Sequence, residues 1–363
     1  MKYNNIFDTQ VSQLGLGFMR HNNLNDSKNL TCFAINHGIN YFEACSFYLN
    51  NQCEEIVSKS LLPYKREQYI LCDKLPILGT DWESIDLELF FNNQLKKCNV
   101  DYFDVYLLQA LDRKCLPILN KYNIINFIEQ KKKEGKIKYI GFSFHDTPNI
   151  LNQIIPLAKW DCAQIQLNYY DYYKNFGKEN YELLTRYNIP IIVMEPCKGG
   201  LLTNRLPQKI QNDFSQAFPN NTLQELCYKF LLSLDNVKII LSGAEKIEWL
   251  QQNINMCNIN TKITDKELQI IQIILQYYHS EYINCTGCDY CKKVCPISVE
   301  ISKNFWYYNT IINNCFDREE YSSFLKEHNT FLDCIHCGRC ERICPQHLPI
   351  RQLFSEKLWS TKL

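Results

Sequence analysis

The sequence has no excess of charge of either sign and no long hydrophobic run. Its 39 Lys and Arg residues balance 39 Asp and Glu residues, so the formal net charge is zero. Without a basic surface we expect no nucleic-acid binding, and without an apolar stretch of about 20 residues we expect no membrane span. The N-terminal residues 1–5 also lack the apolar core of a signal peptide. These absences predict a cytoplasmic protein.

Cysteine is the residue that the sequence has in excess. A chain of 363 residues with 19 cysteines would ordinarily suggest a secreted disulfide protein. Eight of these cysteines, however, fall into two repeats near the C-terminus. We interpret the other eleven, which are scattered through strand-like and helix-like segments, as buried thiols in a reducing compartment.

The two repeats share one spacing. They read Cys285-x2-Cys288-x2-Cys291-x3-Cys295-Pro296 and Cys334-x2-Cys337-x2-Cys340-x3-Cys344-Pro345. This is the spacing of bacterial ferredoxins, in which three cysteines hold one [4Fe–4S] cluster and the fourth ligates the other cluster. The pattern predicts two clusters, one held by Cys285, Cys288, Cys291 and Cys344, the other by Cys334, Cys337, Cys340 and Cys295. A pair of zinc sites is the alternative, although zinc sites usually pair two C-x2-C units and need no third cysteine in the run.

Short apolar runs alternate with longer amphipathic stretches through the first 280 residues. The runs are 13–18, 39–42, 69–72, 102–108, 137–142, 162–166, 189–194 and 237–241. Eight strands, each followed by a helix, indicate an α/β fold of the (β/α)8 TIM barrel class. A doubly wound sheet is the alternative, but no glycine-rich phosphate loop follows the first run. We expect the barrel in residues 1–262, a linking helix in 263–282, and a small, mostly helical ferredoxin-like dicluster domain in 283–363.

Polar residues end most of the predicted strands. In a barrel of this class the chemistry lies at the C-terminal ends of the strands. Reading those ends gives Glu43, Lys74, Gln109, Ser143 to His145, Gln164, Glu195 and Ser242.

Several of these segments resemble the aldo/keto reductase family. The similar segments are 38–43 (Gly-Ile-Asn-Tyr-Phe-Glu), 74–76, 101–108, 141–143, and Gly243-Ala with Asn253. With the cysteine repeats, the chain resembles a subgroup whose reductase barrel carries a dicluster iron–sulfur domain. Segments 141–145 and 195–201 (Glu-Pro-Cys-Lys-Gly-Gly-Leu) are similar to that subgroup.

The resemblance implies a catalytic tetrad of Asp, Tyr, Lys and His for carbonyl reduction by a nicotinamide hydride. Carried over by position, the tyrosine is Tyr48, the proton donor, and the lysine is Lys74, which activates it. Glu43 occupies the aspartate position, and Gln109 occupies the histidine position. An amide can hold a carbonyl by hydrogen bonds but cannot exchange a proton.

The resemblance also implies a nicotinamide site. Ser143 and Gln164 match residues that hold the carboxamide, and Asn253 matches an adenine contact. Met194 replaces a ring-stacking tyrosine, and Trp249 replaces an arginine used for the 2′-phosphate, so the choice between NAD and NADP stays open. Further candidate cofactor contacts are Glu195, Ser242 and the backbone of Lys198-Gly199-Gly200.

Four side chains near the predicted mouth have two interpretations each. His145 either replaces the proton donor lost at Gln109 or is hydrogen-bonded scaffolding. Glu195 either contacts substrate or caps the following loop. Cys45 and Cys197 are either buried thiols or reactive thiolates beside a lysine.

Together these features predict an iron–sulfur oxidoreductase that couples a small-molecule reaction in the barrel, with NAD(P)H as the expected cofactor, to a two-cluster electron-transfer module. A hydride carries two electrons whereas a cluster normally moves one, so a flavin or a radical-forming substrate is a candidate mediator. The alternative is a barrel without carbonyl reductase activity, acting as an electron-transfer or docking protein or as a ferredoxin-dependent reductase. A ferredoxin or another redox protein is the expected partner.

Overall fold

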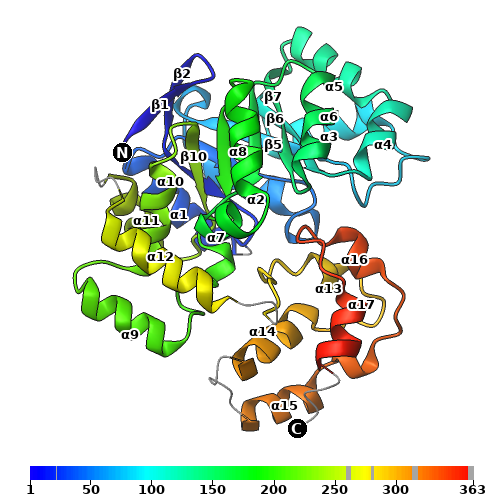
Figure 1. The fold of residues 1–363 in the computed structure, drawn as a ribbon. Coiled ribbons are helices and arrows are strands. Elements are labelled where there is room, and N and C mark those ends of the chain that lie inside the picture. The colour runs from blue at the N-terminus through cyan, green and yellow to red at the C-terminus, as the bar shows by residue number, and fades with distance from the viewer. Residues whose placement is uncertain (22, 259–262, 279–281, 313–317, 359–363) are drawn as a thin grey trace. The chain divides into compact units, whose positions relative to one another are not determined.

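The computed structural model describes residues 1–21, 23–258, 263–278, 282–312 and 318–358. It divides into two compact units, one of Met1–Pro196 with Tyr228–Ile263 and the other of Cys197–Cys227 with Thr264–Leu363. Figure 1 shows the helices and strands of both units, coloured from the N-terminus to the C-terminus. From the sequence we expected boundaries after residues 262 and 282, whereas the structure groups residues 197–227 and the linking helix with the C-terminal unit. Residues 279–281 of the expected linking segment and 359–363 of the expected dicluster domain lie outside the described residues.

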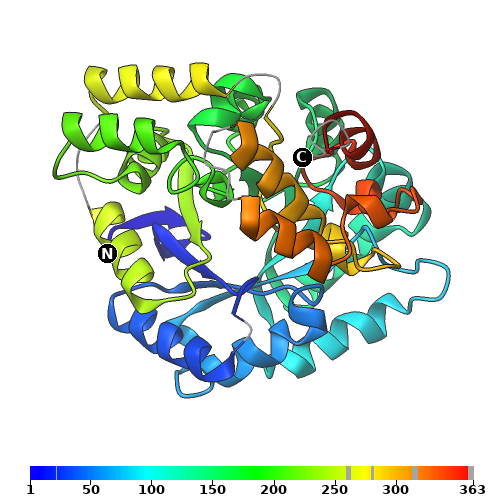
Figure 2. The ribbon, with the colours of Figure 1, turned by 90° about the horizontal axis from the view of Figure 1, so that it is seen from below.

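Eight parallel strands close into a barrel in the first unit, in the order β10-β3-β4-β5-β6-β7-β8-β9. Figure 2 shows these strands surrounded by helices. Every apolar run that the sequence analysis identified contributes one strand, and the predicted (β/α)8 fold is confirmed. The strands are β3 (Leu14–Gly17), β4 (Tyr41–Glu43), β5 (Ile70–Pro76), β6 (Phe103–Leu111), β7 (Ile137–Phe144), β8 (Cys162–Gln166), β9 (Ile191–Met194) and β10 (Val237–Ser242).

A two-stranded antiparallel hairpin, β1 (Tyr3–Ile6) and β2 (Thr9–Ser12), precedes the barrel and was not predicted. Its turn residues Phe7 and Asp8 have φ of 59° and 51°, as a two-residue hairpin turn requires. Phe7 packs in one buried cluster with side chains of the barrel interior, including Tyr41 and Ile239. The hairpin therefore contributes to the apolar core beneath the barrel strands.

Amphipathic helices cover the outside of the barrel. The third helix shows how the sequence fixes them, because Asp86 accepts a hydrogen bond from the Leu89 N–H at its start and Asn99 adopts a left-handed conformation at its end. Its buried residues include Phe91 and Leu95. The helices are α1 (Leu24–Asn36), α2 (Cys53–Leu61), α3 (Leu87–Cys98), α4 (Cys115–Lys121), α5 (Ile124–Lys133), α6 (Pro148–Ile154), α7 (Tyr169–Lys174), α8 (Gly177–Arg186), α10 (Leu223–Leu232) and α11 (Ile247–Asn258).

The second unit is helical in its described residues. A helix begins at Asp265, as expected, behind a capping box in which Thr264 and Glu267 satisfy each other's backbone N–H groups. The aromatic run after the first cysteine repeat, residues 305–308, packs within this unit, since Phe305 is buried and Tyr307 contacts Phe324. The helices are α9 (Gln208–Ala217), α12 (Asp265–Tyr277), α13 (Tyr290–Lys293), α14 (Ile301–Ile312), α15 (Arg318–Glu327), α16 (Arg339–Ile343) and α17 (Ile350–Leu353).

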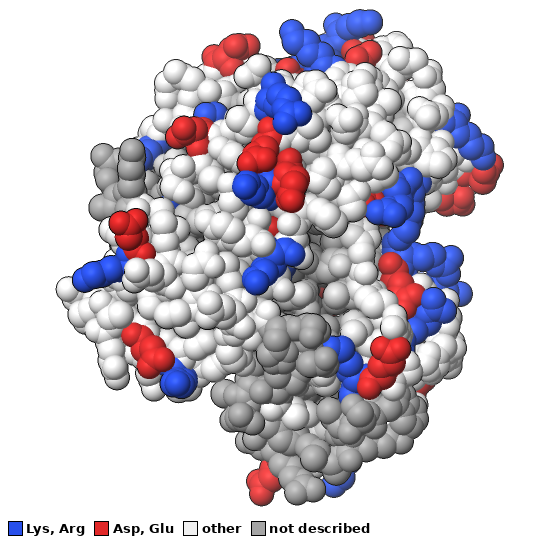
Figure 3. Space-filling view, in the orientation of Figure 1, with Lys and Arg blue, Asp and Glu red and all other residues white. Residues whose placement is uncertain are grey.

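The charged surface agrees with the balanced composition. On the face shown in Figure 3, Lys and Arg side chains lie close to Asp and Glu side chains. Among the described residues, no helix is both long enough and apolar enough to cross a membrane.

Candidate active site and cluster-binding loops

A buried lysine lies at the centre of the barrel's polar site. Lys74 on β5 is 1% exposed, forms an ion pair with Glu43 at the end of β4, and donates to the Tyr48 hydroxyl at 3.1 Å. Tyr48 is itself buried and comes from the loop that follows β4. The structure therefore brings together three of the four tetrad positions that the resemblance implied.

The Glu43 carboxylate keeps the Lys74 side chain positively charged. Burial alone disfavours the ammonium form, but the Glu43 carboxylate outweighs it and raises the pKa of Lys74 above its ordinary value. Lys74 is therefore a cation at neutral pH. The second Glu43 oxygen, Oε2, is buried and accepts no hydrogen bond from the described residues. It is an open acceptor in the mouth of the barrel.

The backbone after Tyr48 is conformationally unusual. Leu49, Asn50 and Asn51 have successive φ values of 51°, 53° and 67°. Left-handed backbone at a leucine is disfavoured, and such conformations persist where the surrounding fold imposes them. The turn thus holds Tyr48 at the start of a short 3-10 helix (Leu49–Asn51).

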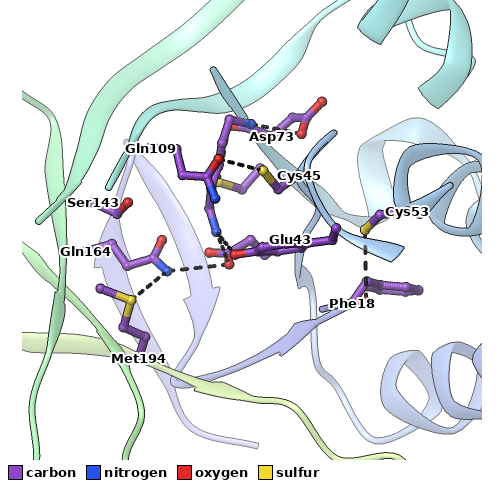
Figure 4. A network of polar contacts seen from close by, with 12 residues as sticks. Phe18, Glu43, Cys45, Cys53, Asp73, Gln109, Ser143, Gln164 and Met194 are labelled. Atoms are coloured by element: carbon purple, nitrogen blue, oxygen red, sulfur yellow. Dashed lines mark hydrogen bonds and ion pairs between the residues drawn. The ribbon is translucent and has the colours of Figure 1, made fainter. Parts of the chain in front are cut away.

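The fourth tetrad position holds an amide. Gln109 on β6 is buried, and its Oε1 accepts a hydrogen bond from the Cys45 thiol at 3.1 Å (Figure 4). Burial raises the pKa of Cys45 well above its ordinary value, although Lys74 opposes this, so the thiol stays protonated. Cys45 is therefore a hydrogen-bond donor to Gln109 in this structure and not a thiolate nucleophile.

His145 follows β7 and is partly buried. Its backbone N–H donates to the carbonyl of Leu111, two residues after Gln109 on the neighbouring strand. The described contacts place the His145 backbone at the C-terminal end of the barrel and leave both interpretations of its side chain as predictions.

The residues proposed for the nicotinamide carboxamide lie next to this network. Gln164 on β8 donates through Nε2 to Glu43 Oε1 at 3.5 Å and to Met194 Sδ at 3.7 Å (Figure 4). Its Oε1 is buried and has no hydrogen-bond partner among the described residues. Ser143 Oγ accepts from the Ala110 N–H at 2.7 Å and keeps its own proton to donate. A carboxamide needs one acceptor and one donor, and these side chains fit it.

The other cofactor candidates are distributed around the barrel's end. Ser242 ends β10 and accepts from Asn253 Nδ2 at 2.8 Å, so these two predicted positions meet. Trp249 on α11 is 47% exposed, with the Lys246 ammonium 5.1 Å from its ring centroid.

Glu195 follows β9 with φ of 57°, and its backbone carbonyl accepts a hydrogen bond from the Asn168 side chain. Lys198-Gly199-Gly200 and Cys197 belong to the second unit.

A buried carboxyl pair behind Lys74 was not predicted. Asp73 and Glu54 are both 0% exposed, and the Gln94 amide donates to Glu54 Oε1 at 3.0 Å and to Asp73 Oδ2 at 3.2 Å. Burial raises the pKa of Asp73 and that of Glu54, and the Glu54 carboxylate raises the pKa of Asp73 further because like charges repel. Strand alternation places Asp73 on the opposite side of β5 from Lys74, where a sequence scan for barrel-facing residues does not look.

The cysteine repeats form two loops within the second unit. One cavity is lined by the four cysteines that the ferredoxin rule groups together, Cys285, Cys288, Cys291 and Cys344. In the other predicted set, Cys340 belongs to a buried apolar cluster, and Cys295 and Cys334 pack against that same cluster. The described residues bring no three His, Cys, Asp or Glu side chains onto one point suited to a single metal ion. A cubane instead distributes four thiolates over four irons around a larger volume, and the cysteine-lined cavity fits that arrangement.

Comparison with known proteins agrees with this geometry. The model of the aldo/keto reductase family matches residues 13–276, and that of the 4Fe-4S dicluster domain matches residues 281–348. An uncharacterized oxidoreductase of Bacillus subtilis, YqkF, is 24% identical over 297 residues, covering 73% of this chain and 93% of that protein. An NADH-specific methylglyoxal reductase of Escherichia coli is 24% identical over 274 residues, covering 64% of this chain and 82% of that protein.

Solved structures share the fold of the barrel. The holo form of the aldo-keto reductase AKR11C1 from Bacillus halodurans has a TM-score of 0.63 and 24% identity, covering 76% of this chain and 96% of its own. An aldo-keto reductase from Klebsiella pneumoniae in complex with NADPH has a TM-score of 0.61 and 20% identity, covering 76% and 95%. The chain therefore belongs to the aldo/keto reductase family, as an oxidoreductase whose barrel is followed by a 4Fe-4S dicluster domain.

Proposed function

We propose that this protein is a nicotinamide-dependent oxidoreductase that interconverts a carbonyl and an alcohol in its barrel and exchanges single electrons through two [4Fe–4S] clusters. The observation that supports this most is the buried triad in which Lys74 donates to Tyr48 at 3.1 Å and pairs with Glu43. A tyrosine hydroxyl that accepts from a cation retains its own proton for donation. That is the arrangement required of a general acid.

In the reductive direction, Tyr48 donates its hydroxyl proton to the substrate oxygen as negative charge develops there. Lys74 stabilises the resulting tyrosinate because its ammonium group is fixed beside that oxygen before the reaction. Glu43 keeps Lys74 charged and oriented. Gln109 holds the substrate oxygen by its amide and supplies no proton.

The nicotinamide would be held by Gln164 and Ser143, whose free acceptor and donor match its carboxamide. When bound, it supplies or takes up the hydride. Met194 is the side chain beside Gln164 that would contact the ring, through a thioether in place of an aromatic ring. Asn253 with Ser242 is the candidate adenine-side contact.

The cluster ligands are the two cysteine sets that the repeat spacing predicts, and the grouping of Cys344 with Cys285, Cys288 and Cys291 around one cavity supports them. When bound, the clusters supply one-electron transfer between the protein and a redox partner such as a ferredoxin. Coupling to a two-electron reaction then needs a flavin or a substrate that is stable as a radical. A small molecule that carries a carbonyl is the proposed substrate class.

A second function is favoured by Gln109 and Met194, which replace a proton donor and a stacking ring. In this alternative the barrel performs no nicotinamide-dependent carbonyl reduction. Electrons instead reach a barrel-bound substrate, or another protein, through the clusters alone. Turnover of a panel of aldehydes and ketones with NADH or NADPH distinguishes the two functions, because only the first predicts it.

The Tyr48→Phe variant tests the proposed function. It removes one hydroxyl, and turnover of the carbonyl panel should fall by about 100-fold or more. Tyr41→Phe is the matched control, because the Tyr41 hydroxyl is buried in the barrel beside the Cys72 thiol and not on Lys74, and its loss should leave turnover unchanged. Equal turnover by Tyr48→Phe and the wild type would remove Tyr48 from the mechanism.

A further inference from the structure

The two cysteine loops have the same spacing but different surroundings. The residue after the first cysteine of each repeat is Thr286 in one loop and Ile335 in the other. Thr286 is 2% exposed, whereas Ile335 is 60% exposed although it is far more apolar. The second cysteine of each repeat follows the same trend, since Cys288 is partly buried and Cys337 is exposed.

The first loop is covered by residues 197–227 of the same unit. A Cβ placed on Gly199 would overlap the carbonyl oxygen of Thr286, so the two backbones are in direct contact there. A Cβ placed on Gly287 would lie 3.6 Å from Arg205 Nη2. Only glycine permits the close approach at Gly199, and both glycines have left-handed φ of 61° and 72°, which glycine adopts readily. This cover explains why Thr286 is buried.

The second loop presents an apolar surface beside its cysteines. Leu332 is 45% exposed and Ile335 is 60% exposed, on either side of Cys334. His336 and Cys337 follow and are also exposed. Large apolar side chains exposed together at a functional loop indicate an interaction site, because water contact is unfavourable for both.

Basic side chains flank this apolar surface. Arg339 and Arg342 lie on α16 and are exposed. The nearest acidic side chain on that helix, Glu341, is engaged by the Arg351 guanidinium at 2.8 Å. Asp333 accepts from the Thr330 N–H at 2.7 Å. The second loop and α16 therefore carry exposed apolar side chains together with two exposed arginines and the exposed Asp333 carboxylate.

Building on the proposed function, we propose that the loop 334–340 is the docking surface for an acidic one-electron carrier protein, such as a ferredoxin, with Ile335 as the central contact. The carrier loses one electron, and the cluster held by Cys334, Cys337, Cys340 and Cys295 gains it; no bond is made or broken. That electron then passes to the cluster of the covered first loop. The surface has the features of transient electron-transfer interfaces, which are small and rely on charge for fast association.

The test is anaerobic stopped-flow mixing of the cluster-loaded protein with a reduced, acidic [2Fe–2S] ferredoxin, following the visible cluster band. The second-order rate constant should fall as ionic strength rises, because salt screens attraction between exposed charges. Arg342→Glu should lower this rate constant about tenfold at low salt. Ile335→Ser should lower it without changing its salt dependence.

Lys293→Glu is the matched control, because Lys293 occupies the same position in the first repeat as Arg342 does in the second. Its rate constant should stay within about twofold of the wild type, because the first loop is not the docking surface. Complete reduction of each variant by dithionite shows that its clusters are intact. A rate constant that does not change with ionic strength overturns the proposal. So does a rate constant that falls as much in Lys293→Glu as in Arg342→Glu. NADPH binding to the same samples tests the proposed function separately.

Discussion

Lys74 donates a hydrogen bond to the Tyr48 hydroxyl at 3.1 Å and pairs with Glu43 on its other side. All three side chains are buried, so the Lys74 ammonium and the Glu43 carboxylate are both shielded from water and each is the other's counter-charge. Breaking such a pair is costly, because the partner that stays behind is left as an unpaired buried charge. We therefore expect changes at this pair to alter the stability of the barrel and, under the proposed function, its turnover.

Lys74→Met should lower the free energy of unfolding by about 3 kcal/mol and turnover by about 100-fold or more. The Lys74→Met, Glu43→Gln double variant should recover part of the stability and none of the turnover, because it removes the orphaned carboxylate but not the need for a cation. Thermal midpoints and steady-state rates measure the two effects. A double variant less stable than Lys74→Met would contradict the ion-pair interpretation.

Gln109→His should raise carbonyl turnover about tenfold, because it returns a proton-exchanging group to the fourth tetrad position. The Cys45 thiol, 3.1 Å from Gln109 Oε1 in the wild type, is placed to donate to an imidazole nitrogen as well. Gln109→Asn is the control for the change in packing. If both variants turn over at the wild-type rate, proton donation from this position does not limit the reaction.

The buried Asp73 carboxyl should make the free energy of unfolding depend on pH. Burial, followed by the neighbouring Glu54 carboxylate, raises its folded-state pKa above the unfolded value of about 3.9. A raised pKa contributes stability that is complete below the unfolded value and is lost as pH rises through the folded value. Asp73→Asn should therefore lose less stability than the wild type as pH rises from about 4 to 9, by on the order of 1 kcal/mol.

Urea unfolding at about pH 4, 6 and 9 measures the Asp73→Asn effect. Glu55→Gln is the control, since Glu55 lies on the same helix as Glu54 but is about half exposed. The Glu55→Gln variant should follow the wild-type pH dependence. Parallel curves for Asp73→Asn and the wild type would mean that the Asp73–Glu54 pair does not hold a proton in the folded state.

The crossed ligand sets predict a pattern among cysteine variants. Cys344→Ser should remove the same cluster as Cys288→Ser, because Cys344 lines one cavity with the first repeat. Cys295→Ser should remove the same cluster as Cys337→Ser. Iron content and the EPR spectrum of the remaining reduced cluster identify which one is lost. Matching spectra from Cys344→Ser and Cys337→Ser would contradict the crossed assignment.

Much of the fold was predictable because its signals are local. Each barrel strand is an apolar run between helical segments, and α12 begins at a capping box that the sequence displays. The N-terminal hairpin was missed because its turn is Phe7-Asp8, which lacks the Asn-Gly or Asp-Gly signal of such turns. Its positive φ values depend on tertiary packing of Phe7 in the core.

Site residues that face the barrel interior could be predicted from the sequence, whereas those on the outer side of the strands could not. Strand ends, which converge in a barrel, pointed to Glu43 and Lys74, whereas Tyr48 lies in a loop and was implied only by the family resemblance. The pairing of Asp73 with Glu54 joins β5 to α2 from outside the barrel, and no short-range pattern reports it. Likewise, the contact of Gly199 with Thr286 joins segments separated by a strand and four helices, so the joining of residues 197–227 to the second unit could not be read from spacing.

The central claim is that the barrel binds a nicotinamide and that this site communicates with the clusters. An anaerobic titration of the cluster-loaded protein with NADPH and with NADH tests it, following tryptophan fluorescence and the visible cluster band together. We expect saturable quenching by at least one nucleotide and bleaching of the cluster band when substrate or a mediator is present. No response of either signal to either nucleotide would contradict it and would leave the clusters as the route by which electrons enter.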